Sequence, residues 1–185
     1  MKKLKFILLL PAVVFLILCL LSLRAYTIAG PSMSPTLLLN ELAIVNHNAY
    51  KFGQAERGDM ILYFDSIKNS VAVKRLIGIP GDKIEVKENV VYINDIEQKQ
   101  TFQPRENYNH VPQENGLGDI VAIENIFGQD HLITYTKGKS DKRNFTSITL
   151  NENEYFILGD HRDNSADSRF IGPINGEQIF GKVVW

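Results

Sequence analysis

The most apolar part of the chain is an uninterrupted run, Phe6–Leu23, which is 18 residues long and carries no charge. As a helix rising about 1.5 Å per residue it would extend about 27 Å, close to the hydrocarbon thickness of a thin bilayer. Three lysines precede the run, and only Arg24 follows it closely. This charge distribution predicts that residues 1–5 are a cytoplasmic N-terminus, that residues 6–24 form one transmembrane anchor, and that the remaining chain lies outside.

A cleaved signal peptide is the alternative interpretation of this segment. The apolar region of a signal peptide is about 7–15 residues long, which is shorter than the run in this chain. Thr27-Ile28-Ala29, however, fits a weak cleavage site. The length therefore favours a retained anchor, while the segment alone leaves both interpretations open.

Beyond the apolar run, the pattern changes to short β-branched and aromatic stretches that are bounded by turn residues, and a helical period is hard to find. This pattern predicts a mainly β domain. Glu88-Asn89 fits a two-residue turn between two of the predicted strands. The ten predicted strands are Ala25–Ala29, Leu42–Asn46, Met60–Phe64, Val71–Ile77, Lys83–Val86, Val90–Ile93, Ile120–Glu124, Leu132–Tyr135, Tyr155–Leu158 and Gly181–Val184.

Two polar stretches interrupt the strand pattern. Residues 95–118 are rich in Asn, Gln, Pro and Gly, which predicts a long surface excursion, and Lys137–Asn144 predicts a second exposed turn. We therefore expect a core built from residues 25–84 and 149–185, interrupted by a variable β region at residues 85–148.

Composition narrows the function. The formal net charge of −1 shows no basic excess that would indicate nucleic-acid binding. The single cysteine, Cys19, excludes an intrachain disulfide and a cysteine-based zinc site. The histidines are scattered singly, so we expect no metal, no cofactor, and histidines on the surface. These residues are His47, His110, His131 and His161.

Lys74 stands out within its predicted strand. Alternation places it on the same face as Ala72 and Leu76, which are both apolar. Burial would disfavour the charged amine, and a neutral amine is a competent general base near pH 7, for example toward a serine hydroxyl. A lysine on an edge strand that points into solvent remains the simpler interpretation of the strand taken alone.

Ser32 lies in a turn constrained by Gly30, Pro31 and Pro35, directly after a short predicted strand. Such a turn can present a hydroxyl and a backbone N–H to a reacting carbonyl group. It can equally be a turn with no further role.

Four segments, in this order, resemble the signature motifs of bacterial type I signal peptidases. They are Ser-Met-x-Pro-Thr-Leu at residues 32–37, Arg-Gly-Asp-Met-Ile-Leu at 57–62, Lys-Arg-x-x-Gly-x-Pro-Gly-Asp at 74–82, and Gly-Asp-x-Arg-Asp-Asn-Ser-x-Asp-Ser-Arg at 159–169. The resemblance implies a signal-peptidase-like β-barrel or sheet core with a smaller inserted β region, preceded by one transmembrane helix. It also implies a membrane-bound serine endopeptidase with no cofactor.

The resemblance assigns roles to individual residues. Ser32 would be the nucleophile, with its own backbone N–H as one oxyanion donor, and Lys74 would be the general base. Ser165 would orient the lysine amine. Arg75 with Asp160 would form a structural pair that holds the loops near the site.

Asp167 with Arg169 would form a second such pair. Residues Tyr26 and Ile28 on one strand and Val71 and Val73 on another would flank an extended substrate, as in strand addition. The expected partners are the lipid bilayer and preprotein signal peptides that end in Ala-x-Ala. The implied location is the bacterial inner membrane, single-pass, with the catalytic domain on the extracytoplasmic side.

The chain departs from the family pattern at two positions. Many members have a serine where Gly30 stands, and its hydroxyl helps to form the oxyanion hole. Glycine has no such donor, so the second donor must come from a backbone amide or water, or be absent. His161 replaces a common asparagine, and we expect little consequence.

Two other functions remain open at this point. One is a specialised relative that processes a single pilin-like or conjugation substrate, because folds and dyads are shared across substrates. The other is a non-catalytic, anchored β module that binds peptides or proteins. The non-catalytic module would tolerate loss of Ser32 or Lys74, whereas a peptidase would not.

Overall fold

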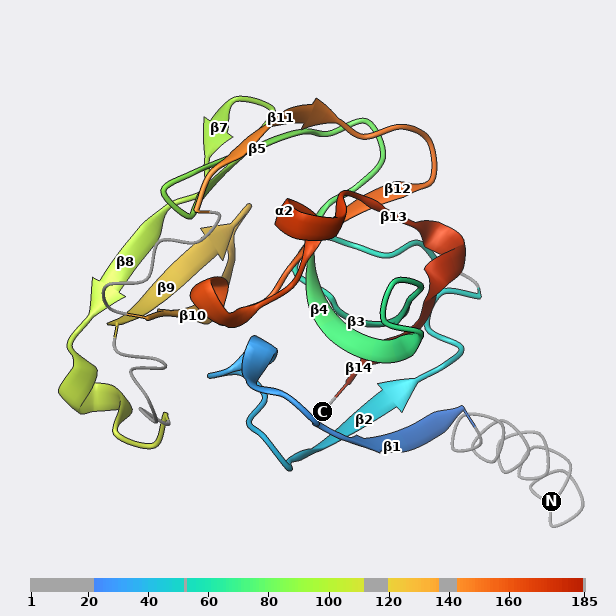
Figure 1. The fold of residues 1–185 in the computed structure, drawn as a ribbon, viewed down its shortest axis with the longest axis horizontal. Coiled ribbons are helices and arrows are strands. Elements are labelled where there is room, and N and C mark those ends of the chain that lie inside the picture. Colours follow the sequence, from blue (N-terminus) through green and yellow to red (C-terminus); the bar gives the residue numbers. More distant parts are fainter. Residues whose placement is uncertain (1–21, 52, 112–119, 137–142, 185) are drawn as a thin grey trace, which may run out of the picture.

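The computed structural model describes residues 22–51, 53–111, 120–136 and 143–184 (Figure 1). Within these ranges the elements are β-strands, short 3-10 turns and one four-residue α-helix, α2 (Ser168–Ile171). The mainly β class predicted from the sequence is confirmed.

The main sheet has seven strands in the order β1-β2-β14-β3-β4-β12-β13, and every neighbouring pair is antiparallel. Its end strands, β1 and β13, are not paired with each other in the described part of the chain. The core is therefore an open sheet, and the barrel alternative of the prediction is wrong. The strands are β1 (Leu23–Thr27), β2 (Leu42–Asn46), β14 (Ile179–Val183), β3 (Met60–Asp65), β4 (Ser70–Gly78), β12 (Glu154–Leu158) and β13 (Ile174–Asn175).

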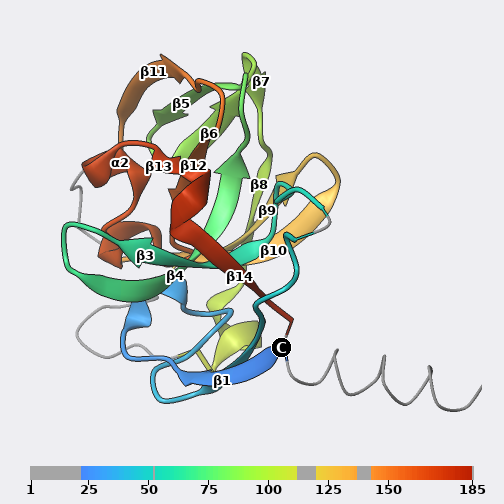
Figure 2. The same cartoon turned by 90° about the vertical axis from the view of Figure 1, so that its right-hand side faces the viewer.

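Two smaller sheets are formed by the middle of the chain. One has the strand order β10-β9-β8, and the other has the order β11-β5-β6-β7. Figures 1 and 2 both show β5, β7 and β11 at the end of the molecule opposite to β1. The strands are β5 (Lys83–Lys87), β6 (Val90–Ile93), β7 (Ile96–Glu97), β8 (Gln100–Gln103), β9 (Ile120–Ile126), β10 (Gln129–Tyr135) and β11 (Phe145–Thr149).

Alternation along β12 joins the main sheet to these smaller sheets. Phe156 and Leu158 pack into the core of the β5–β6 sheet, while Ile157 between them packs with Leu76 and Tyr63 on the other face of the main sheet. All five side chains are almost fully buried. One strand therefore contributes to two cores, which fixes the inserted region against the main sheet.

The predicted surface excursion at residues 95–118 is wrong in part. β7, β8 and a 3-10 turn at Arg105–Tyr108 lie within it. β8 pairs with β9 from Gln100 to Gln103, so its polar side chains are carried by a strand edge rather than by a loop. Residues 112–119 and 137–142 of the two predicted polar stretches lie outside the described residues.

The predicted anchor, residues 6–24, lies outside the described residues except at its end, where Leu23 and Arg24 already belong to β1. In the part of the chain that the structure describes, we find no helix with the length and hydropathy needed to cross a bilayer.

Candidate active site

Ser32 and Lys74 meet, although they are 42 residues apart in the sequence. Ser32 lies in a 3-10 turn at Pro31–Met33, and Lys74 lies in the middle of β4. The distance from Lys74 Nζ to Ser32 Oγ is 2.7 Å, and Lys74 Nζ also donates to the Val73 carbonyl oxygen at 3.1 Å. The hydroxyl and the amine are therefore within hydrogen-bond distance, as base and nucleophile must be.

The environment of Lys74 shifts its protonation equilibrium toward the neutral amine. The residue is 4% exposed. Burial is the main cause that lowers its pKa to about 8, and the positive charge of Lys68 lowers it further. The carboxylates of Asp167, Asp160 and Asp65 act in the opposite direction without cancelling the effect of burial. The surface-lysine interpretation is therefore wrong, because the amine lies inside the protein beside a hydroxyl.

The turn that carries Ser32 is held from two sides. Met33, the next residue, is 1% exposed and packs into the core below β1 and β2. On the other side, the His161 N–H donates to the Ser32 carbonyl oxygen at 3.1 Å. The loop at residues 159–169 therefore fixes the backbone of Ser32 directly.

Ser165 is brought into the same site, but without the contact expected of it. Its Oγ is buried and makes no hydrogen bond with a described residue. Its closeness to Ser32 is shown by Gly159: a Cβ there would lie 2.3 Å from Ser165 Oγ and 2.5 Å from the Ser32 carbonyl oxygen. There is thus no room for a side chain at residue 159. Ser165 lies at the site, and its hydroxyl makes no hydrogen bond with a described residue.

Arg75 and Asp160 form the first of the two expected pairs. Arg75 Nε and one terminal nitrogen donate to the two Asp160 oxygens at 2.8 and 2.7 Å, and both side chains are buried. Thr36 Oγ1 also donates to Asp160, at 2.5 Å. Burial alone would raise the pKa of Asp160, but the Arg75 guanidinium, together with His131 and the Thr36 hydrogen bond, lowers it. The pair joins β4, the residue-159 loop and the turn after Ser32.

Asp167 and Arg169 form the second pair. Arg169 donates to Asp167 through Nε at 2.9 Å and through a terminal nitrogen at 2.8 Å. Asp167 also accepts the Gly159 N–H at 3.0 Å, and Arg169 donates to Asn89 Oδ1 at 2.8 Å. Through Asp167 the pair joins the two ends of the loop at residues 159–169, and through Arg169 it joins the loop to Asn89 of the inserted region.

A third buried pair, Glu124 with Arg162, is absent from the sequence-based prediction. Arg162 donates to both Glu124 oxygens, one of them at 2.8 Å, and both side chains are essentially inaccessible. Glu124 shares a face of β9 with Ala122 and Ile126, which are apolar and buried. A carboxylate on an otherwise apolar strand face needs a buried partner, so the sequence pattern around Glu124 could have predicted a buried ion pair.

The histidines correct a second prediction. His161 is 1% exposed, with Nε2 at 3.2 Å from Thr136 Oγ1. His131 is nearly buried, with Nε2 at 3.2 Å from Glu124. The surface placement is therefore wrong for these two, because both lie where the inserted region packs on the residue-159 loop. His47 is partly buried and lies 2.9 Å from the Tyr26 hydroxyl, whereas His110 is exposed.

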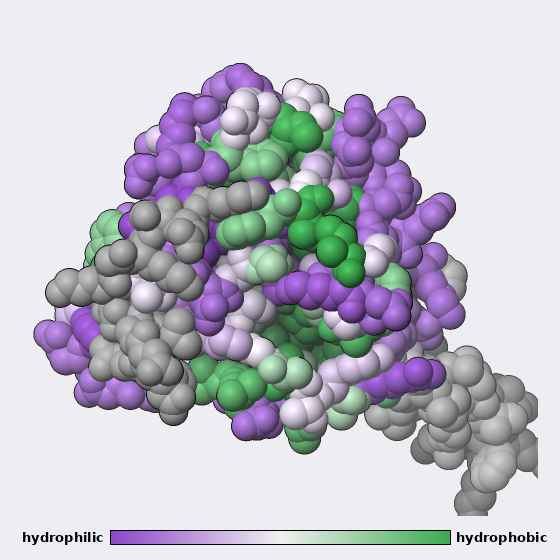
Figure 3. All heavy atoms as spheres, in the orientation of Figure 1, coloured by the Kyte–Doolittle hydropathy of each residue, from purple (hydrophilic) through white to green (hydrophobic). Residues whose placement is uncertain are grey.

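A cleft of about 880 Å³ opens beside the Ser32–Lys74 dyad. The four residues expected to flank a substrate, Tyr26, Ile28, Val71 and Val73, all line it, together with Ser165. Figure 3 shows that apolar side chains gather in a hollow on this face of the molecule and that polar ones surround it.

Both walls of the cleft carry an open strand edge. β1 pairs only with β2 among the described strands, which leaves its other edge free. β4 pairs with β12 only from Arg75 onward, so the edge of Ser70–Lys74 on that side is unpaired. An extended peptide lying between the two edges could form main-chain hydrogen bonds with either.

Comparisons with known proteins agree with the sequence motifs. Residues 1–185 match the sequence model of the family described as signal peptidase, peptidase S26. Signal peptidase IB of Staphylococcus aureus (strain Mu50) is 37% identical over 175 residues, covering 93% of this chain and 83% of that protein. Signal peptidase I P of Bacillus subtilis subsp. natto is 33% identical over 157 residues, covering 85% and 69%. A crystal structure of a signal peptidase I from Enterococcus faecalis V583 aligns with a TM-score of 0.44 and 25% identity, covering 71% of this chain and 97% of that one.

Proposed function

The chain belongs to the signal peptidase family, peptidase S26, and on that premise we propose that it is a serine endopeptidase that removes N-terminal signal peptides from exported preproteins. The observation that carries the proposal is the 2.7 Å distance between Lys74 Nζ and Ser32 Oγ beside a cleft with two open strand edges. A binding module would need neither the buried amine nor its contact with a hydroxyl.

The chemistry follows from the protonation state of Lys74. The neutral amine takes the Ser32 hydroxyl proton as Oγ attacks the scissile carbonyl carbon, and the Ser32 backbone N–H stabilises the resulting oxyanion. The lysine then gives the proton to the leaving nitrogen, and the mature protein departs with a new amino terminus. Lys74 next takes a proton from water, whose oxygen attacks the acyl-enzyme ester. As the acyl–Oγ bond breaks, Lys74 returns this proton to Ser32 Oγ, and the signal peptide leaves with a free carboxylate.

Ser165 and the two arginine–aspartate pairs act by positioning the lysine amine and the loop beside it. Ser165 lies beside the turn of Ser32, and its buried hydroxyl makes no hydrogen bond with a described residue, which supports a role in orienting the lysine amine. Arg75–Asp160 and Asp167–Arg169 hold the loop that carries Ser165.

The substrate binds as an extended strand between β1 and β4. Ile28 and Val73 are buried and line the cleft, and we expect the apolar pockets near them to be shallow and to favour small side chains. This supports an Ala-x-Ala sequence before the cleaved bond. Main-chain hydrogen bonds supply affinity, so the remaining substrate sequence can vary widely.

Residues 6–24 anchor the enzyme in the bacterial inner membrane, with residues 1–5 in the cytoplasm and the catalytic domain on the extracytoplasmic side. The support for this placement is the uncharged run and the lysines before it. Confinement of enzyme and signal peptide to one membrane raises their effective concentration. Ser32 follows Arg24 by only eight residues, which keeps the dyad near the bilayer surface.

The test is cleavage of a preprotein that carries an Ala-x-Ala site by the detergent-solubilised chain, with the cut located by mass. Wild type is expected to cut after the second alanine. Ser32→Ala and Lys74→Ala are each expected to lose about 10⁴-fold or more in kcat, because residues that act as a unit fail together. Lys99→Ala, which removes an exposed lysine outside the cleft, is the control and should cut normally.

The other outcomes are distinct. Activity that persists in Lys74→Ala would refute the proposed base. A folded wild type that cuts one pilin-like substrate but no general preprotein would establish the specialised relative. Binding of signal peptides without any cleavage would establish the non-catalytic module.

A further inference from the structure

The cleft has a direction that can be derived from the sheet. Each neighbouring pair from β1 through β2, β14 and β3 to β4 is antiparallel, so four reversals leave β1 and β4 running the same way. Both strands run toward the dyad, because β1 leads to Ser32 and β4 leads to Lys74. The far end of the cleft is therefore formed by Tyr26 on one wall and Ser70 on the other.

The part of the substrate at that far end follows from the proposed function, on which this inference rests. The enzyme's anchor precedes β1, so the membrane lies toward the far end of the cleft. The signal peptide is also held in the membrane and precedes the scissile bond. Residues upstream of the bond therefore occupy the cleft between the dyad and Ser70.

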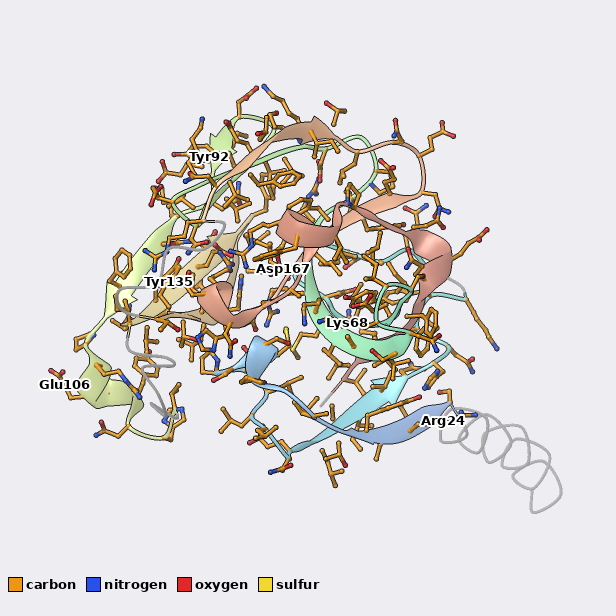
Figure 4. All side chains as sticks on the ribbon, viewed as in Figure 1. Arg24, Lys68, Tyr92, Glu106, Tyr135 and Asp167 are labelled. Atoms are coloured by element: carbon orange, nitrogen blue, oxygen red, sulfur yellow. The ribbon has the colours of Figure 1, made fainter. Side chains whose placement is uncertain are left out.

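Lys68 stands at this far end. It lines the cleft and belongs to the turn between β3 and β4. The turn is fixed by Asp65, whose Oδ1 accepts the Ile67 N–H at 3.0 Å and the Lys68 N–H at 3.1 Å. Figure 4 shows Lys68 beside β4, well separated from Arg24 at the start of β1. The ammonium group is thus carried on an ordered backbone beside the substrate path.

Two other charged residues, Asp163 and Lys74, line the cleft. Asp163 accepts hydrogen bonds from Arg143 at 2.7 Å, the Thr136 N–H at 3.0 Å and Asn89 Nδ2 at 3.1 Å. Lys74 lies at the opposite end of the cleft, at the dyad, and its lowered pKa leaves part of it neutral at neutral pH. Lys68 is exposed and forms no ion pair with a described residue, so its charge is the one that a bound substrate meets.

We propose that Lys68 forms a charge-selecting subsite that favours an acidic side chain, and disfavours a basic one, about four to six residues before the scissile bond. Ser70 lies four residues before Lys74 on β4. Every β-strand rises by about 3.3 Å per residue, so a substrate strand paired with β4 advances one residue for each residue of β4. The Lys68 charge also acts at the dyad, where it contributes to the lowered pKa of Lys74.

The test compares matched preproteins that differ only by Glu or Lys at the fourth, fifth or sixth residue before the cut. With the detergent-solubilised full chain at low salt, wild type is expected to favour the Glu substrate about 3- to 10-fold in kcat/KM, mainly through KM, at one or more of these positions. Lys68→Glu is expected to reverse the preference. High salt should weaken both effects, because the groups are exposed to solvent. The ratio between two substrates cancels any change that Lys68→Glu causes at Lys74.

Lys99→Glu, which makes the same charge change on an exposed lysine outside the cleft, is the control and should keep the wild-type ratio. The subsite is overturned if the Glu-to-Lys ratio is the same in wild type and Lys68→Glu at all three positions. It is also overturned if Lys68→Glu weakens both substrates equally and only in micelles that contain phosphatidylglycerol, since Lys68 would then bind a lipid headgroup. If wild type cuts neither substrate, the proposed function itself fails.

Discussion

Lys74 shows how one side chain can be held between two opposing influences. Burial removes the water that would stabilise its ammonium form, while Asp167 and Asp160 lie near enough to favour that form. Each of these carboxylates is already paired with an arginine, which limits its pull on the lysine. Burial therefore dominates, and the pKa of about 8 leaves an appreciable neutral fraction at neutral pH.

The first prediction concerns the pH dependence of cleavage. Because the base must be neutral, kcat/KM should rise about tenfold per pH unit well below pH 8 and level off above it. A lysine with its ordinary value near 10.5 would move the plateau above pH 10. The measurement is the initial rate of cleavage of one preprotein from pH 5 to pH 10. A rate that is flat across this range would contradict the assignment of Lys74 as the base.

The second prediction concerns Gly30, where the backbone does not require a glycine. Its φ of −154° is ordinary extended geometry, and a Cβ there would meet no atom within 4 Å. Gly30→Ser should therefore fold normally and, by adding an oxyanion donor, raise kcat by about tenfold with little change in KM. Gly30→Ala is the matched control without a hydroxyl. Equal kcat values for the two variants would mean that a backbone donor or water already fills that role.

At the scale of elements, much of the fold could be predicted because strand alternation is local. The turn at Glu88-Asn89 was predicted and is observed, with φ of 47° and 66° between β5 and β6. β8 was missed because Gln100–Gln103 carries no apolar alternation and depends on β9 for its pairing. The pairing of Ser32 with Lys74 could be predicted only from the family motifs, because no local sequence pattern relates residue 32 to residue 74.

The third prediction concerns the loop that carries Ser165. Gly159→Ala places a methyl group against Ser165 Oγ and the Ser32 carbonyl oxygen, so these groups must move apart. We expect a loss of about 1–3 kcal/mol in the free energy of unfolding and at least a hundredfold loss in kcat, because small displacements of reacting groups are costly. Denaturant unfolding and cleavage assays measure the two effects, and Gly30→Ala is the control because its new methyl group meets open space. Normal activity in Gly159→Ala would show that the loop can shift without disturbing the dyad.

At the scale of the whole molecule, the inserted region holds the loop at residues 159–169 in place. Asn89 contacts both Asp163 and Arg169, and Glu124 binds Arg162. Figure 4 shows Asp167 of the same loop near the centre of the molecule. Burial would raise the pKa of Glu124, but Arg162 and then His131 more than offset this and lower it. The carboxylate therefore stays ionised, and its contribution to stability persists as the pH falls through the ordinary range of glutamate.

The fourth prediction tests this attachment. Glu124→Gln leaves Arg162 buried without its counter-charge and should lower the free energy of unfolding by about 3 kcal/mol. The double variant Glu124→Leu/Arg162→Met should recover most of that loss, because it removes both buried charges. Urea unfolding of the detergent-solubilised chain measures each value. Asp95→Asn, which breaks an exposed pair with Lys83, is the control and should change little. A double variant no more stable than Glu124→Gln would mean that the pair contributes more than charge compensation.

The position of β14 determines when, during synthesis, the main sheet can be completed. Residues 179–183 lie in the interior of the main sheet, between β2 and β3, and are synthesised after every other described strand. Until they arrive, β2 has no partner on that side, and β1 with its wall of the cleft is not joined to β4. We therefore expect a chain that carries Ser32 and Lys74 but still lacks residues 179–183 to have no peptidase activity. If residues 6–24 are the membrane anchor, as proposed, we expect the dyad to become active only after residues 179–183 have also been exported.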